Sequence, residues 1–275
     1  MMCAVILAAG EGRRLRPLTA VRPKALCPVG NVALLDLALR RVAALGFAGP
    51  DVVAVNASYL ADRVVAHVGG RATLSVESDG PLGTSGGVGN LRDWIAGRGV
   101  LVANADAYLA GAGLDGLLDG WDGSRVRLLG VPAAGGPAEF GPFRFAGLSL
   151  LPWDVVAPLT TGPSDLVRTV WRPVEAAGRL DVVPFAGTYL DTGTPGDYLA
   201  ANLHAARAGS PSGCLVDPGA TVTGRLDRAV VGAGAVVWGT VTRAVVWPGG
   251  FVGPDEHLTD AVRVGADLTV AASIA

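Results

Sequence analysis

A single lysine stands in a chain whose other basic residues are all arginines. Of the twenty-two Lys and Arg residues, only Lys24 is a lysine. It follows a glycine-rich segment and lies close to Arg13, Arg14 and Arg16. An ammonium group is a compact point charge on a flexible stem, which suits it to contact a phosphate oxygen. A lone lysine could stand there by chance, but this setting favours phosphate binding.

The segment before Lys24 has the composition of a phosphate-binding loop. The apolar run over residues 3–7 predicts a buried strand. The small residues after it would let backbone N–H groups approach a ligand closely. The pattern is neither a Walker A loop, because it lacks Gly-Lys-Ser/Thr, nor the dinucleotide fingerprint, because Leu15 replaces the third glycine. The candidate nucleotide-binding residues here are Leu7, Ala8, Ala9, Gly10, Glu11, Gly12 and Arg13.

The whole run from residue 7 to Lys24 resembles the N-terminal signature of the sugar-1-phosphate nucleotidyltransferases. Its glycines, Arg14, the Pro17-Leu18-Thr19 step and Lys24 all fit that pattern. The resemblance implies that Arg14 and Lys24 hold a nucleoside triphosphate and stabilise the charge of the departing pyrophosphate. It implies, too, that both residues are catalytic and that backbone donors from Gly10 to Arg13 cradle the phosphates.

A second glycine-rich stretch, residues 80–87, resembles the nucleobase loop of the same family. Small residues can form a backbone-lined slot for a flat base, although an ordinary turn capping the following helix would have a similar composition. The resemblance favours guanylyl- and uridylyltransferases over thymidylyltransferases, and hence GTP or UTP. The residues expected to contact the nucleotide are Pro81, Leu82, Gly83, Thr84, Ser85 and Gly86.

Two aspartates match the positions at which the family binds Mg²⁺. Asp106 follows an apolar strand-like run, and Asp191 lies in Tyr-Leu-Asp-Thr-Gly-Thr-Pro. An isolated aspartate after a strand is often only a turn former or a helix cap. Mg²⁺ is bound by a few carboxylates together with phosphate and water oxygens. The resemblance therefore implies that Asp106, also a catalytic and nucleotide-contacting residue, shares an Mg²⁺ cofactor with Asp191.

The sugar side departs from the family pattern. Many members carry a second lysine after the central strands, and this chain has none. The resemblance leaves Glu139, Arg144 and Gly147 as the candidate sugar-binding residues, with Arg144 as a source of the missing charge. The acceptor could be an unusual sugar phosphate or a sugar-like cyclitol phosphate.

Composition limits the class of protein. Half of the 275 residues are apolar, 17% are charged, and the formal net charge is −2. This charge gives no support for nucleic-acid binding, and no apolar run is long enough to span a membrane. The scattered Cys3, Cys27 and Cys214 predict reduced thiols in a cytoplasmic protein.

Strand-like and helix-like segments alternate over the first two hundred residues. Strands are expected near residues 5–7, 51–55, 74–77, 100–103 and 126–131, with helices at 33–44, 60–67, 86–95 and 114–118. This alternation predicts an α/β domain with a Rossmann-like, mostly parallel sheet covered by helices on both faces. In such sheets ligands bind at the carboxyl ends of the strands. We assign residues 1–205 to this nucleotidyltransferase domain.

The tail, residues 206–275, has a different pattern. A small-residue stretch over 205–213 reads as a linker, and residues 216–222, 231–237 and 246–252 then repeat at a spacing of fifteen. Such repeats predict a short hexapeptide-type, left-handed β-helix, as found on longer members of the family. His257 is its only histidine, so we expect a structural role. The tail would pack on the catalytic domain or form a homo-oligomer.

These observations predict a Mg²⁺-dependent enzyme that joins a nucleoside triphosphate and a sugar-1-phosphate into a nucleotide-sugar and pyrophosphate. Such chemistry depends on positioning and charge neutralisation, so no protein nucleophile is needed. The alternative is a catalytically silent relative, a regulatory subunit that binds the same ligands. The missing second lysine favours this alternative, whereas the set formed by Arg14, Lys24, Asp106 and Asp191 opposes it.

Overall fold

The computed structural model describes residues 1–133 and 136–273, which fall into two compact units. The first unit comprises residues 1–11 and 35–189. The second comprises residues 12–34 and the chain from Leu190 onward. The segment with Arg14 and Lys24 therefore belongs to the same unit as Asp191 and the tail, whereas Asp106 belongs to the other unit.

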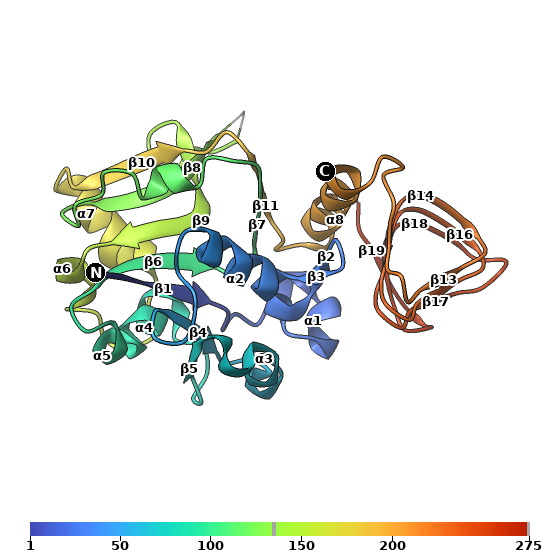
Figure 1. Cartoon of the computed structure of the whole chain (residues 1–275), viewed down its shortest axis with the longest axis horizontal. Helices are drawn as coiled ribbons and strands as arrows, with labels where there is room; N and C mark the ends of the chain where they lie inside the picture. Colours follow the sequence, from blue (N-terminus) through green and yellow to red (C-terminus); the bar gives the residue numbers. More distant parts are fainter. Residues whose placement is uncertain (134–135, 274–275) are drawn as a thin grey trace. The chain divides into compact units, whose positions relative to one another are not determined.

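A seven-stranded sheet forms the centre of the first unit (Figure 1). β9 runs antiparallel to both of its neighbours, and every other pair in the described sheet is parallel. The mostly parallel sheet expected from the alternation is thus confirmed. Across the sheet the strands are β10 (Leu180–Pro184), β8 (Val126–Pro132), β9 (Phe143–Leu151), β6 (Gly99–Asn104), β1 (Met2–Leu7), β4 (Val53–Ala57) and β5 (Thr73–Val76).

The connecting segments are mostly short helices. They are α2 (Leu34–Ala44), α3 (Ala61–Val68), η3 (Gly69–Arg71), α4 (Gly83–Asn90), α5 (Arg92–Ile95), η4 (Asp115–Leu117), α6 (Trp153–Val156), η5 (Val167–Trp171) and α7 (Arg172–Ala176). Two further strands, β7 (Ala107–Ala110) and β11 (Thr188–Asp191), lie outside the seven-stranded sheet.

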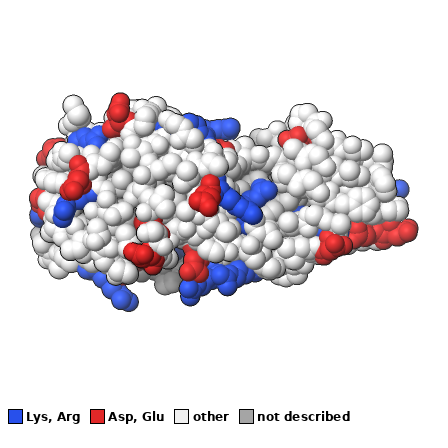
Figure 2. Space-filling view, turned by 90° about the horizontal axis from the view of Figure 1, so that it is seen from below, with Lys and Arg blue, Asp and Glu red and all other residues white. Residues whose placement is uncertain are grey.

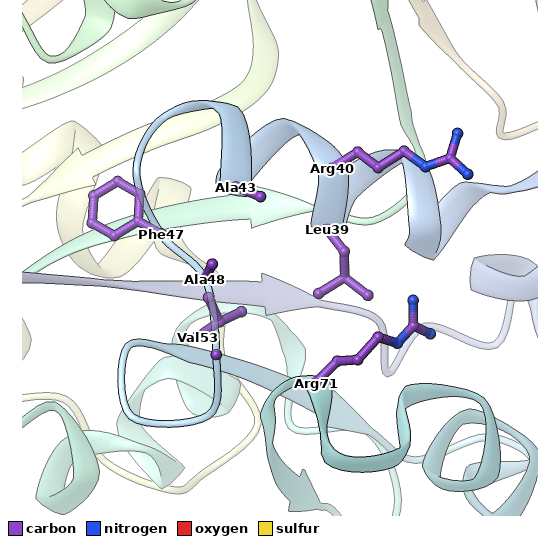
Figure 3. Close-up of a pocket in the computed structure, with 8 residues that line it drawn as sticks. Leu39, Arg40, Ala43, Phe47, Ala48, Val53 and Arg71 are labelled. Atoms are coloured by element: carbon purple, nitrogen blue, oxygen red, sulfur yellow. The ribbon is translucent and has the colours of Figure 1, made fainter.

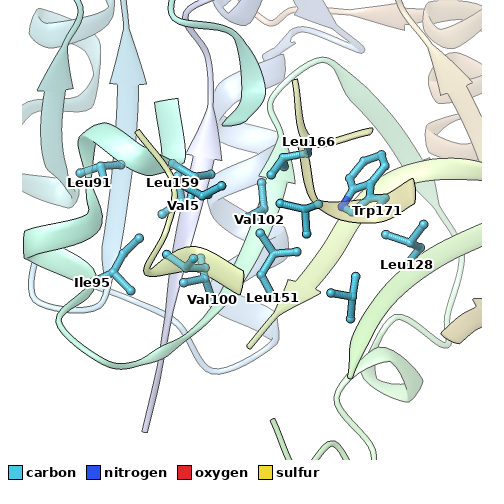
Figure 4. Packing of buried hydrophobic residues seen from close by; sticks show 14 of the residues in the cluster. Val5, Leu91, Ile95, Val100, Val102, Leu128, Leu151, Leu159, Leu166 and Trp171 are labelled. Carbon is cyan, nitrogen blue, oxygen red and sulfur yellow. The ribbon is translucent and has the colours of Figure 1, made fainter. Parts of the chain in front are cut away.

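The core of this unit lies against the faces of β1 and β6. Val5 packs in one cluster with Ile95 of α5 and Trp171 of η5 (Figure 4). Ala4 and Ile6 point to the opposite face and are also fully buried. Strand β1 is therefore covered on both faces, as parallel strands usually are, and only its carboxyl end is left for a ligand.

The segment over residues 80–87, expected to form a nucleobase loop, is partly helical in the structure. The nucleobase stretch is not a loop throughout, because α4 already begins at Gly83. The backbone N–H of Ser85 donates to the carbonyl of Ser164 at 3.1 Å, and Ser164 donates to Leu82 at 2.9 Å. These bonds to a distant segment stabilise a first helical turn for which glycine has a poor intrinsic propensity.

The second unit begins with short turns. η1 (Arg13–Leu15), α1 (Leu18–Val21) and η2 (Lys24–Leu26) lead to the hairpin of β2 (Pro28–Val29) and β3 (Val32–Ala33). The longest helix, α8 (Pro195–Gly209), is capped by Thr194, whose side chain accepts from the Asp197 N–H. Because α8 continues to Gly209, the linker predicted over 205–213 was wrong in its first half. The domain boundary expected at 205–206 falls inside α8 and stays a prediction.

Stacked parallel strands follow α8. One sheet contains β12 (Leu215–Val216), β14 (Arg225–Val231), β16 (Thr240–Val246), β18 (His257–Val264) and the antiparallel β19 (Leu268–Ala271). A second contains β13 (Thr221–Val222), β15 (Val236–Val237) and β17 (Phe251–Val252). Val230 pairs with Val245, so the spacing of fifteen sets the register. Coils of parallel strands are thus present, and their left-handed sense stays a prediction.

The coils pack on α8 and on the N-terminal part of the second unit. The indole Nε1 of Trp247 donates to the Tyr198 hydroxyl at 2.9 Å, and that hydroxyl donates to the carbonyl of Pro28. Asn31 donates to the carbonyl of Val231 at 3.0 Å. Within this unit the tail therefore packs on segments that the sequence analysis assigned to residues 1–205.

Charged side chains of both signs are interspersed on the molecular face in Figure 2, with uncharged residues over most of that face. Within the described ranges, the structure has no helix long and apolar enough to cross a membrane.

Candidate functional site

A tight turn at Gly12 positions the cationic segment of the second unit. Gly12 has φ of 62°, and its carbonyl accepts from the Thr19 hydroxyl at 2.8 Å. A Cβ at this position would lie 2.8 Å from Thr19 Cγ2 and 3.0 Å from Lys24 Cβ. Glycine is thus required both for the conformation and for the close approach, and the turn fixes where the Lys24 side chain begins.

Asp191 joins the two cations that the sequence singles out. Its Oδ1 lies 3.6 Å from Lys24 Nζ, and its Oδ2 lies 3.4 Å from Arg14 Nη2. The Lys24 side chain is 8% exposed, whereas those of Arg14 and Asp191 are 69% and 46% exposed. A buried ammonium needs a counter-charge because desolvation penalises the charged form. The structure therefore brings Arg14, Lys24 and Asp191 together, with the carboxylate open to solvent.

Gly193 allows this arrangement. A Cβ on Gly193 would lie 2.7 Å from Arg14 Nη2 and 3.1 Å from Asp191 Oδ1. Any larger residue would displace the guanidinium or the carboxylate. The Asp-Thr-Gly motif thus supplies both the acid and the space for its cationic partner.

The carboxyl ends of β1, β4 and β6 surround a cavity of about 180 Å³ in the first unit, here called the strand-end cavity. Asn56 and Asn104 line it where their strands end. No atom lies within 4 Å of the place that a Cβ on Gly10 would take, so the backbone there is accessible to a ligand. The predicted site residues that line this cavity are Leu7, Ala9, Gly10, Pro81, Gly83, Thr84 and Asp106.

A buried polar chain connects the two glycine-rich segments of the first unit. The Ala8 N–H donates to Asn56 Oδ1 at 2.7 Å, and Asn56 Nδ2 donates to Glu77 Oε1 at 2.7 Å. The other oxygen of Glu77 accepts from the Leu82 N–H at 2.8 Å. Burial raises the pKa of Glu77, and its hydrogen bonds from Leu82 and Asn56 oppose that rise. One carboxyl group therefore links the phosphate segment, through Asn56, to the segment expected to bind the nucleobase.

The remaining predicted nucleotide residues lie at the margins of these features. Ser85 and Gly86 are buried in the first turn of α4, and Thr84 Oγ1 accepts from the Leu166 N–H at 2.9 Å. Glu11 is the last residue of the first unit's N-terminal stretch, residues 1–11, and Arg13 is exposed at the start of η1.

Asp106 is half-buried between β6 and β7. Its neighbour Ala107 accepts at its carbonyl from Nη2 of the buried Arg41 at 2.8 Å. Burial lowers the pKa of Arg41 to about 10. The other guanidinium nitrogen, Nη1, has no hydrogen-bond partner among residues 1–133 and 136–273. Arg41 thus holds the backbone that presents Asp106.

The predicted sugar-side residues all lie at or beside β9. Glu139 is exposed, and its Oε2 accepts from the Phe145 N–H at 2.9 Å. Arg144 is exposed and pairs in register with Val131 of β8. Gly147 has φ of 80°, and a Cβ there would lie 2.4 Å from Ala107 Cβ. Gly147 therefore lets β9 pass close to the residue that follows Asp106.

A second cavity, of about 500 Å³, shares Thr84 and Asn104 with the strand-end cavity. We call it the aromatic cavity because Phe145 and Trp171 line it, with ring centroids 4.5 Å apart. A further apolar hollow lies between α2 and β4, with Arg40 and Arg71 beside Leu39 (Figure 3). That hollow contains no residue of the predicted site.

Carboxylates are the donors available for a metal ion. Asp106 and Asp191 offer the hard oxygen ligands that Mg²⁺ prefers, and they belong to different compact units. Within the part of the chain that the structure describes, His, Cys, Asp and Glu side chains form no cluster of three or more that could hold a metal.

A family model described as nucleotidyl transferase matches residues 3–117. The chain is 31% identical over 239 residues to the N-acetylmuramate alpha-1-phosphate uridylyltransferase of Caulobacter vibrioides, and the match covers 74% of this chain and 97% of the relative. The chain belongs to the sugar-1-phosphate nucleotidyltransferase family. This nucleotidyltransferase is also 28% identical over 266 residues to the mannose-1-phosphate guanylyltransferase of Mycobacterium tuberculosis, across 80% of this chain and 73% of that relative.

A solved Bacillus anthracis structure, provisionally assigned as a glucose-1-phosphate thymidylyltransferase, has the same fold. The TM-score is 0.64 at 17% identity, over 74% of this chain and 95% of that chain. The family and the enzymatic nature expected from the sequence are therefore confirmed.

Several residues of the candidate site were not singled out by the sequence. Asn56, Glu77 and Trp171 occupy it through contacts between segments far apart in the chain. The sequence does contain a signal for Asn56, because an asparagine at the end of a buried strand often contacts a ligand or a loop. Glu77 and Trp171 had no comparable signal.

Proposed function

We propose that this nucleotidyltransferase catalyses Mg²⁺-dependent transfer of a nucleotidyl group to a sugar-1-phosphate or a sugar-like cyclitol phosphate. An oxygen of the acceptor phosphate attacks the α-phosphorus of the triphosphate. The bond between that phosphorus and the bridging oxygen to the β-phosphate breaks, and pyrophosphate leaves. The products are a nucleotide-sugar and pyrophosphate.

The observation that carries this proposal is the pairing of Lys24 and Arg14 with Asp191. One carboxylate lies within 4 Å of both cations, so the group keeps a net positive charge. A triphosphate offers them stronger partners, because charge-assisted hydrogen bonds to phosphate oxygens are favourable. Lys24 and Arg14 would then hold the phosphates and stabilise the negative charge that develops on the departing pyrophosphate. The carboxylate of Asp191 would be released in the same step.

We propose Mg²⁺ as the cofactor, with Asp106 and Asp191 as its protein ligands. When bound, Mg²⁺ supplies charge neutralisation to the triphosphate oxygens. Both carboxylates fit this role, since Asp191 is accessible and Asp106 lines the strand-end cavity. With Arg14 and Lys24 on the phosphates, the oxygens of Asp191 would be available, together with those of Asp106, to hold Mg²⁺.

For the nucleobase we propose guanine or uracil. The strand-end cavity is lined by Pro81, Gly83 and Thr84, and the two relatives named above are a uridylyl- and a guanylyltransferase. For the sugar side, Glu139, Arg144 and Gly147 remain our proposed residues. Removal of the Arg144 charge should raise the KM for the acceptor and leave the KM for the nucleotide unchanged.

The test is a pyrophosphate-release assay with ATP, GTP, UTP, CTP and dTTP, each combined with a panel of sugar-1-phosphates. We expect release with GTP or UTP, and only when Mg²⁺, nucleotide and acceptor are all present. Lys24→Ala and Asp191→Asn should each remove this activity. Arg92→Ala, which alters an exposed arginine paired with its neighbour Asp93, serves as the control and should retain it.

Release of pyrophosphate without an acceptor would indicate hydrolysis of the nucleotide and would contradict the proposed transfer. The cytoplasmic location and a homo-oligomer formed through the tail remain predictions. Fractionation of the source cells tests the first, and light scattering of the full chain tests the second.

A further inference from the structure

The apolar hollow between α2 and β4, here called the α2 hollow, has the size of a small-molecule binding site. Its volume is about 410 Å³, and ligand pockets usually measure about 300–1,000 Å³. Among the described residues that line it, none also lines the strand-end cavity or the aromatic cavity. A molecule bound there would therefore not occupy the place of the nucleotide or of its acceptor.

Small residues keep this space open. Ala43 borders it one helical turn after Leu39, on the same face of α2. Ala48 and Gly49 border it from the segment that leads into β4. Gly49 has φ of 90°, and no atom lies within 4 Å of the place that a Cβ there would take. These side chains are too short to fill the hollow, so its apolar surface stays accessible to a ligand.

The two ends of the α2 hollow differ in character. The side chains of Arg40 and Arg71 extend toward one end, and the Phe47 ring lies at the other (Figure 3). Arg40 is exposed and has no hydrogen-bond or ion-pair partner among residues 1–133 and 136–273. Water satisfies many exposed arginines, but this one stands beside apolar surface that water solvates poorly. The hollow thus joins an apolar wall to a cationic end.

Arg71 is held in a fixed position at the cationic end. Its Nε donates to the Val68 carbonyl at 3.1 Å, and its Nη2 donates to the His67 carbonyl at 2.6 Å. Its Nη1 donates to Asp36 Oδ1 at 2.7 Å, so one carboxylate balances one guanidinium. With His67 neutral, the two arginines and Asp36 leave this end one positive charge in excess. An anion with a single charge would balance that excess.

We infer that the α2 hollow binds a monoanionic amphipathic ligand, a carboxylate with a straight aliphatic chain. The carboxylate accepts from Arg40 in a charge-assisted hydrogen bond, for which the planar guanidinium is well shaped. The chain lies along Leu39 and Ala43 toward Phe47, where burial of its CH₂ groups is favourable. The inference is independent of the proposed function, because the hollow is separate from both site cavities.

The probe is octanoate, compared with 1-octanol, which has the same chain length and no charge. Binding to the full chain is measured by titration calorimetry below the concentration at which octanoate forms micelles. We expect one saturable site for octanoate and at least about tenfold weaker binding of 1-octanol, because the charge-assisted hydrogen bond is lost. Hexanoate, which is two CH₂ groups shorter, should bind about tenfold more weakly than octanoate.

One pair of variants tests the cationic end. Arg40→Met keeps an apolar stem and removes the charge, so the preference for octanoate over 1-octanol should disappear. Arg92→Met is the matched control, because Arg92 is an exposed arginine that does not line the hollow. It should keep the wild-type preference.

A second pair tests the apolar wall. Ala43→Leu should fill the hollow and abolish the binding of both compounds. Ala44→Leu places the same side chain on the next residue of α2, which is exposed and does not line the hollow. It should bind both compounds as wild type does. Leucine has a good helix propensity, so both variants should keep the wild-type melting temperature.

Saturating GTP or UTP should leave the affinity for octanoate unchanged. Displacement of octanoate by either nucleotide would place it in the strand-end cavity and overturn the inference. Equal affinity for octanoate and 1-octanol, absence of saturable binding, or unchanged binding by the Ala43→Leu variant would overturn it as well.

Discussion

Replacement of Trp247 by phenylalanine should destabilise the second unit. Trp247 is 1% exposed, and its indole N–H donates to the Tyr198 hydroxyl at 2.9 Å. Arg22 stacks over the same ring, with its guanidinium carbon 4.9 Å from the ring centroid. The substitution removes the donor and part of the buried ring, so two losses act together.

The expected magnitude follows from these losses. A neutral hydrogen bond contributes about 1 kcal/mol, and incomplete filling of a buried aromatic site costs about 1–2 kcal/mol more. We therefore expect Trp247→Phe to lower the free energy of unfolding by about 2–3 kcal/mol. For a chain of this size each kcal/mol corresponds to about 2–4 °C in melting temperature. Trp247→Ala should cost about 3–5 kcal/mol.

The assay is urea unfolding followed by tryptophan fluorescence, with thermal melts in parallel. Trp238→Phe is the control, because Trp238 lies on the same coils but is 48% exposed. It should change stability by no more than about 0.5 kcal/mol. A double-mutant cycle with Tyr198→Phe should give a coupling energy of about 1 kcal/mol. The reasoning is refuted if the Trp247 and Trp238 variants are equally stable, or if the cycle shows no coupling.

Three further outcomes follow from the site. Lys24→Arg should lower the rate of pyrophosphate release about tenfold or more, which corresponds to a rise of about 1.4 kcal/mol in the activation free energy. The reason is that a bulkier guanidinium cannot replace a buried ammonium. Wild-type turnover of this variant would show that the lysine is not required. Asp106→Asn should abolish Mg²⁺-dependent turnover without changing the melting temperature, and retained activity at limiting Mg²⁺ would remove Asp106 from the metal site. Burial raises the pKa of Glu77, so the folded protein binds the carboxyl proton of Glu77 more tightly than the unfolded chain does. The protonated carboxyl therefore stabilises the fold at low pH. This contribution is lost as the pH rises through the pKa that Glu77 has in the folded protein. The stability of wild type relative to Glu77→Gln should therefore fall as pH rises above about 4.5 in urea titrations, and a constant difference would contradict the assigned shift.

The sequence predicted those features that depend on local pattern. Apolar runs located β1, β4 and β6 to within a few residues, and the repeat of fifteen set the register that pairs Val230 with Val245. In each case a short segment contains the information, because periodicity and steric limits act over neighbouring residues.

Features that depend on distant partners could not be predicted in this way. The first turn of α4 is held in part by Ser164, far along the chain, whose carbonyl accepts from the Ser85 N–H. The buried role of Glu77 depends on Asn56 and Leu82. The antiparallel direction of β9 is set by its two neighbours in the sheet. None of these partners is marked by spacing in the sequence.

The most direct test of the central claim is ³¹P nuclear magnetic resonance of the products. The full chain is mixed with Mg²⁺, GTP or UTP, and an equimolar sugar-1-phosphate. Lys24 and Arg14, paired with Asp191, are proposed to bind the triphosphate of the nucleotide. If so, the sugar-phosphate signal disappears. The two signals of a nucleotide-sugar diphosphate and the signal of pyrophosphate appear together. An unchanged sugar phosphate, whether or not the triphosphate is hydrolysed, would contradict it.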